Sequence, residues 1–87
     1  MAGGLERALE RLRGAEFVEE GWELVGDHTH TKYLVLKTAG AAQAYVLFKR
    51  HGCPADFARI VFEDGEVLEF RGEEAGMFER GLWEVIQ

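Results

Sequence analysis

Two short apolar runs near the middle of the chain constrain the fold more than any other feature of the sequence. Residues 33–36 (YLVL) and 45–48 (YVLF) are rich in the aromatic and β-branched side chains that favour strands, and a small-residue link containing Gly40 joins them. Because neighbouring side chains of a strand point to opposite faces, both faces of this strand pair are apolar. We therefore expect a central hairpin that is covered by helices on one face and by a second subunit on the other.

The link between the two runs predicts the register of this hairpin. A two-residue type II′ turn at residues 40–41 needs φ > 0 at its first position, where the sequence has glycine. A four-residue loop over residues 39–42 gives the same pairing. In that pairing Val35 lies opposite Val46, and their side chains share one face of the sheet.

A second hairpin is predicted in the C-terminal half. Residues 58–63 and 66–71 both have strand character, and the dipeptide Asp64-Gly65 separates them. Asp-Gly favours a two-residue type I′ turn, which would place Phe62 opposite Val67.

Helices are predicted at both ends of the chain. Residues 5–12 carry leucine and alanine at i, i+3, i+4 and i+7, which indicates an amphipathic helix that ends at Gly14 or continues to Gly21. Residues 73–86 carry a second apolar stripe. Glycine is a poor helix former, so Gly81 in this stripe is easiest to explain where another element packs close to it.

These elements predict an α+β fold for residues 1–87, which form a single domain. With a short strand at residues 22–25, the sheet is an antiparallel meander of four to five strands flanked by an N-terminal and a C-terminal helix. A chain of 87 residues with 47% hydrophobic residues can bury one small core.

The composition also narrows the class of protein. No apolar run approaches the roughly 20 residues that span a bilayer, and the N-terminal segment lacks the apolar region of a signal peptide. A single cysteine cannot form an internal disulfide, so we expect a cytoplasmic protein without a membrane partner. The lack of serine excludes a Ser-His-Asp enzyme, and the absence of asparagine together with abundant glutamate is typical of a heat-adapted bacterium.

The charge is distributed unevenly along the chain. The net charge is −6, yet no acidic residue lies between Asp27 and Asp56. The cations of this stretch are Lys32, Lys37, Lys49 and Arg50. In one interpretation the acidic flanks complement this basic hairpin. In the other, Lys32, Lys49 and Arg50 contact an anion or RNA, although the net negative charge of the chain repels polyanions at long range.

The metal-competent side chains lie next to the same hairpin. Extending the predicted register places His30 opposite His51 and His28 opposite Cys53, all on one face. Two pairs of the form H-x-H and H-x-C make an acceptable ligand set for zinc. The alternatives are an inert, solvated cluster, or histidines that serve catalysis or anion binding. No cofactor other than zinc is indicated.

Two motifs resemble known families. A helix followed by EGWELV (residues 20–25) and a later strand ending in YVLFKR (residues 45–50) resembles small bacterial domains of unknown function with a helix–GWELV–strand–FKR signature. The resemblance covers residues 5–50 and implies a small α+β sheet without a known activity. Those domains begin with a strand before the helix, which this sequence lacks, and do not have its C-terminal hairpin and helix.

A second likeness is to small toxin-like RNA-binding domains, in which a helix leads into G-W-x-L-V and then a strand bearing a histidine. It implies a functional histidine at His28 or His30. The acidic composition and residues 54–87 do not match those domains.

The sequence therefore predicts a non-enzymatic interaction or regulatory module that acts as a homodimer. The alternatives are an RNA-binding toxin-like domain that uses the basic hairpin with His28 and His30, and a metal-binding domain.

Overall fold

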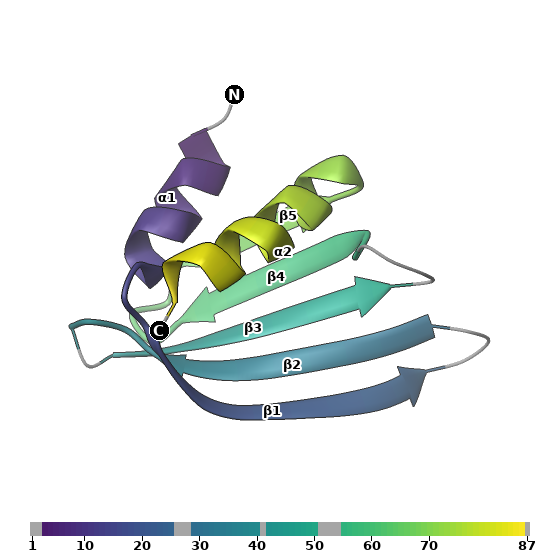
Figure 1. Ribbon diagram of the computed structural model, residues 1–87, viewed down its shortest axis with the longest axis horizontal. Coiled ribbons are helices and arrows are strands. Elements are labelled where there is room, and N and C mark those ends of the chain that lie inside the picture. The colour runs from purple at the N-terminus through teal and green to yellow at the C-terminus, as the bar shows by residue number, and fades with distance from the viewer. Residues whose placement is uncertain (1–2, 26–28, 41, 51–54, 87) are drawn as a thin grey trace.

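The computed structural model describes residues 3–25, 29–40, 42–50 and 55–86. Two helices and five strands follow one another along the chain: α1 (Gly3–Leu12), β1 (Glu16–Val25), β2 (Thr29–Lys37), β3 (Gln43–Arg50), β4 (Phe57–Phe62), β5 (Val67–Arg71) and α2 (Glu73–Val85). The strands form one antiparallel sheet in the order β1-β2-β3-β4-β5 (Figure 1). The predicted α+β meander with a helix at each end is confirmed.

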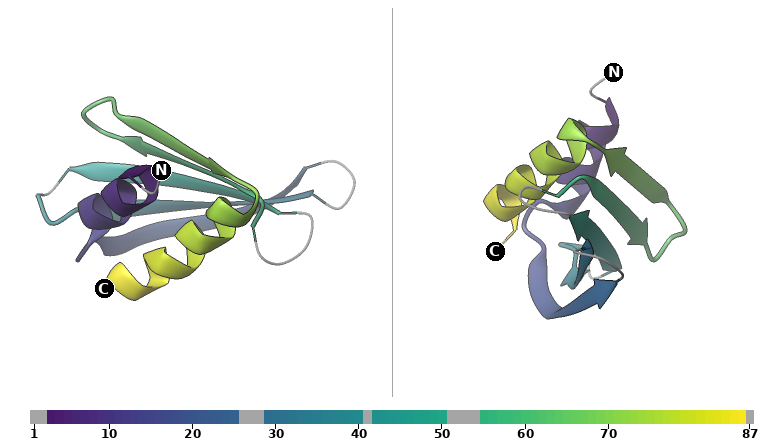
Figure 2. Two further views of the ribbon diagram at one scale, coloured as in Figure 1. Left: turned by 90° about the horizontal axis from the view of Figure 1, so that it is seen from above. Right: turned by 90° about the vertical axis from the view of Figure 1, so that its right-hand side faces the viewer.

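Both helices lie on the same face of the sheet, as the views in Figures 1 and 2 show. Helix α2 packs against β4 and β5, and α1 packs against α2 and β5. The opposite face has no helix of the described chain over it, and we call it the open face.

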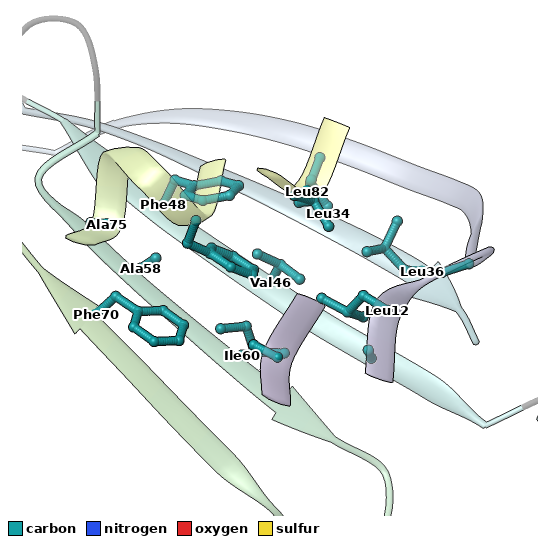
Figure 3. Packing of buried hydrophobic residues seen from close by; sticks show 14 of the residues in the cluster. Leu12, Leu34, Leu36, Val46, Phe48, Ala58, Ile60, Phe70, Ala75 and Leu82 are labelled. Atoms are coloured by element: carbon teal, nitrogen blue, oxygen red, sulfur yellow. The ribbon is translucent and has the colours of Figure 1, made fainter. Parts of the chain in front are cut away.

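The core lies between the helices and the inner face of the sheet. Strands β2 and β3 contribute Leu34, Leu36, Val46 and Phe48, all of which are buried (Figure 3). From α2, the Phe78 ring lies 5.8 Å from the Phe48 ring and 5.2 Å from the Phe70 ring, measured between centroids. Burying a large apolar side chain contributes about 1.5–3 kcal/mol, so this cluster holds α2 on the sheet.

The central hairpin has a different register from the predicted one. Val35 lies opposite Tyr45. The preceding residue, Leu34, belongs to the core and lies opposite Val46. The backbone N–H of Thr38 donates to the carbonyl of Ala42 at 2.8 Å, so three residues separate this closing pair instead of two or four. A slip of one residue turns every side chain of β3 to the other face, and the predicted pairing of Val35 with Val46 is wrong.

The second hairpin departs from prediction in the same way. The N–H of Gly65 donates to the carbonyl of Phe62 at 2.9 Å, and Phe62 and Glu66 close the loop. Gly65 has φ of 99°, and the loop encloses three residues, whereas the predicted type I′ turn has two. Val61 therefore pairs with Val67, and the predicted opposition of Phe62 and Val67 is wrong.

Strand β1 is longer than residues 22–25. Helix α1 ends at Leu12, and Gly14 follows with φ of 75°. Gly21 is not a helix terminus but a residue in the middle of β1, opposite Tyr33. The pairing of β1 with β2 shifts between Phe17 and Glu19, which marks a bulge at the residue between them.

Candidate functional site

Of the four predicted zinc ligands, His30 is the one that lies within the described residues. His28, His51 and Cys53 lie outside the described residues, so the four-residue zinc site stays a prediction. His30 is exposed on β2, and its cross-strand partner is Arg50, so its predicted pairing with His51 is wrong. Within the described residues, no three histidine, cysteine, aspartate or glutamate side chains converge as metal ligands.

The three predicted anion-binding cations do not form one surface. Lys32 points to the helix side of the sheet, where its Nζ lies 3.6 Å from Glu20 Oε2 and 5.2 Å from the centre of the Trp83 ring. Arg50 also points to that side and forms an ion pair with Glu79 of α2. These two cations bind within the chain, which agrees with the interpretation that acidic elements complement the basic hairpin.

Lys49 points to the open face, because it follows Phe48 and precedes Arg50 in an alternating strand. Its Nζ lies 5.5 Å from the centre of the Phe57 ring. Around the same ring are the guanidinium carbons of Arg59 at 5.8 Å and Arg71 at 4.9 Å. We call Phe57 with these three cations the cationic corner.

Two of the corner cations share one carboxylate. Arg59 Nε donates to Glu69 at 2.7 Å, and Arg71 lies 3.4 Å from the other oxygen of the same group. Three cations against the Glu69 carboxylate leave this part of the described open face positive. The correct register was needed to find it, because β4 and β5 must be paired before Arg59 and Arg71 fall on the same face as Lys49.

The centre of the open face is apolar. Its side chains, which we call the apolar belt, are Tyr33, Val35, Tyr45, Leu47, Val61 and Val67. Tyr33, Tyr45 and Val67 are 43%, 46% and 50% exposed. A shallow hollow of about 160 Å³ lies among Tyr33, Tyr45 and Val61. The prediction of a second apolar face was right, although the predicted register assigned Val46 to the same face as Val35.

The far edge of the open face is acidic. Glu16 and Glu19 of β1 are exposed, and their cross-strand partners are Lys37 and Val35. Since paired residues share a face, both carboxylates lie on the open side, and we call them the acidic edge. Lys37 lies on the same side, so the two carboxylates leave this edge negative by one charge. From one edge to the other, the open face therefore runs from net negative through apolar to cationic.

A separate ion-pair cluster fastens α1 to the β4–β5 turn. Arg7 and Arg11 both donate to Glu66 at 2.6 Å, and Arg11 also reaches Asp64 at 2.9 Å. The Arg11 guanidinium lies 3.8 Å from the centre of the Phe62 ring. Hydrogen bonds from Arg7 and then Arg11 lower the pKa of Glu66, and the Glu66 N–H and then Arg11 lower the pKa of Asp64. This cluster positions the helix.

Comparison with known protein families, with curated proteins and with solved structures finds no match to this chain. Neither helix of the described chain has the length and apolarity that crossing a bilayer requires.

Proposed function

We propose that this protein is a non-enzymatic interaction module that acts as a homodimer, with the open face of the sheet as its contact surface. The observation that carries the proposal is the apolar belt, whose two tyrosines lie diagonally from each other on the adjacent strands β2 and β3 and are nearly half exposed. A contiguous apolar surface bordered by charged residues is typical of a protein–protein contact.

The strand edges support this choice of surface. An unprotected edge strand would offer a second route to association through backbone hydrogen bonds. The β1 edge has a bulge between Phe17 and Glu19, and its exposed carboxylates repel a second copy that approaches edge to edge. On the other side, β5 has five residues. Protected edges leave the face as the favoured contact.

The charges of the chain disfavour RNA as the occupant. Lys32 and Arg50 are engaged with Glu20 and Glu79, and Arg59 and Arg71 share Glu69. A net charge of −6 adds long-range repulsion to any polyanion. A second copy of the chain carries the same net charge, but the open face carries both signs of charge, so local attraction between the two faces can offset this repulsion.

The size of the face sets the expected affinity. Five strands about 4.8 Å apart make a face about 20 Å wide, with a flat footprint of about 400 Å². A standard interface buries about 800 Å² per partner, so this one is small even with the relief of its side chains. We expect a dissociation constant in the micromolar range, equivalent to about −8 kcal/mol.

Sedimentation equilibrium between about 1 µM and 1 mM tests the proposal. At the lowest concentration the expected mass lies between the 9.8 kDa of one chain and twice that value, and it rises towards twice that value with concentration. Tyr45→Glu should abolish the rise, because it places a charge in the apolar belt. Met77→Glu is the matched control: Met77 is 48% exposed on α2, away from the open face, and the variant should dimerise normally.

Two results would contradict the proposal. One is a constant mass of 9.8 kDa up to 1 mM. The other is a monomer that binds single-stranded RNA at low salt and loses the RNA on Lys49→Glu, which would establish the RNA-binding alternative instead.

A further inference from the structure

We infer that the two copies dock in one preferred orientation, in which the acidic edge of each chain covers the cationic corner of the other. This inference rests on the homodimer proposed above. It adds the orientation of the partner and the residues that select it.

The pairing register places the two charged regions at opposite corners of the open face. Glu19 lies on β1 in the row of Val35, Tyr45, Val61 and Val67. Lys49 lies on β3 two rows further from the Gly40 loop, next to Phe57 and Arg71. Four residues of the apolar belt share the row of Glu19, and the other two, Tyr33 and Leu47, form the row between Glu19 and Lys49. The face thus carries a charge gradient along its diagonal.

A two-fold symmetric contact can use this gradient. In such a dimer the same patch is buried on both subunits, and every contact between two different residues occurs twice. When the symmetry axis crosses the apolar belt perpendicular to the charge diagonal, the apolar belts of the two copies pack against each other. Each acidic edge then lies over the partner's cationic corner.

Other orientations lose this match. An axis along β3, parallel to the strands, would place each Lys49 beside its own copy in the partner. Like charges that face each other across an interface are unfavourable and act mainly to suppress wrong arrangements. The charge gradient therefore selects one relative orientation of the two copies. The apolar contacts alone would specify this orientation only weakly.

A pair of charge reversals tests the orientation. Glu19→Lys alone gives a homodimer in which the new ammonium group meets the cationic corner of the other copy in both contacts. Lys49→Glu alone likewise places a new carboxylate against the acidic edge of the other copy in both contacts. In a mixed dimer of the two variants, both contacts become attractive. We expect each variant alone to dimerise about tenfold more weakly than the wild type, and the equimolar mixture to recover wild-type affinity as a heterodimer.

Native mass spectrometry of the mixture measures the heterodimer directly, with one variant isotopically labelled. The heterodimer should greatly exceed the statistical half of all dimers, and the excess should shrink in 1 M salt, where the screening length is about 3 Å. The control pair is Glu84→Lys with Arg80→Glu, because both residues are exposed on α2. This pair should mix statistically.

The outcomes separate the orientation from the dimer itself. If the wild type dimerises and the reversal variants mix statistically, or if they weaken the dimer and the mixture does not recover, this orientation is wrong and the homodimer stands. If the wild type is monomeric up to 1 mM, the proposed function fails first.

Discussion

The ring of Tyr33 on β2 lies across Gly21 of β1, its cross-strand partner. A Cβ atom added at Gly21 would overlap with the ring carbons and the hydroxyl of Tyr33. The glycine therefore provides space for an aromatic ring that belongs to the apolar belt. A glycine in a strand interior is unfavourable by roughly 0.5–1 kcal/mol, and the packed ring offsets this cost.

A double-mutant cycle should reveal this contact. Gly21→Ala is expected to reduce the free energy of unfolding by about 1 kcal/mol, because the methyl group displaces the Tyr33 ring. In a Tyr33→Ala background the same substitution should be neutral or stabilising, because alanine favours the strand more than glycine does. Urea unfolding measures all four proteins. Equal effects in both backgrounds would show that the ring does not depend on the glycine.

The two helices meet at Gly81. A Cβ there would lie 2.8 Å from a methyl carbon of Leu9, so the expected close packing at this glycine is observed. Gly81→Ala gains about 1 kcal/mol of helix propensity but overpacks the contact, and we expect a net loss of about 1 kcal/mol in unfolding free energy. Gly4→Ala is the control, because its Cβ would lie 3.7 Å from the Phe70 ring, an ordinary contact. That variant should be stabilised.

The ion pair between Arg50 and Glu79 joins β3 to α2. Their side chains are 18% and 12% exposed, and the N–H of Ala55 also donates to Glu79 at 3.3 Å. Glu79→Gln should reduce the unfolding free energy by about 2 kcal/mol, less than the roughly 3–5 kcal/mol for breaking a fully buried pair. Glu84→Gln, at an exposed position on the same helix, should have little effect. Thermal unfolding at pH 7 compares the two variants.

Acid should weaken the attachment of α1. Since the pKa values of Asp64 and Glu66 are lower in the folded protein than their ordinary values, protonation favours the unfolded chain. Their contribution is therefore present above about pH 5 and is lost as pH falls through the lowered folded values, below the ordinary carboxyl range of about 4. Glu66→Gln should flatten the loss of stability below about pH 5, as followed by urea unfolding across this range. Glu6→Gln, at an exposed position on α1, should leave the profile unchanged.

The kinds of element and their order were predictable because the signals for them are local. Helical periodicity in residues 5–12, turn residues such as Gly65 and the two apolar runs each act within a few neighbours along the chain. An order of helix, consecutive short strands and helix then leaves an antiparallel meander as the simplest topology.

The predicted grouping of Lys49 with Arg50 differs from the arrangement in the structure. Lys49 and Arg50 are adjacent in a strand, so they cannot share a face, and the structure places Arg50 against α2 and Lys49 in the open face. The other members of the cationic corner come from β4 and β5. Grouping Phe57, Arg59 and Arg71 with Lys49 requires the pairing of three strands.

The sequence by itself determined which segments are helices and strands, the chain order of the meander, and the presence of an apolar surface that the two helices do not cover. Only the tertiary structure decided which side chains form that surface. The physical reason is the two-residue period of a strand: the Thr38–Ala42 and Phe62–Glu66 pairs each enclose three residues, and this one-residue difference from the predicted two-residue turns exchanges the faces. Turn propensity distinguishes these loops only weakly, whereas the burial of Val46 and Phe48 in the core favours the observed register.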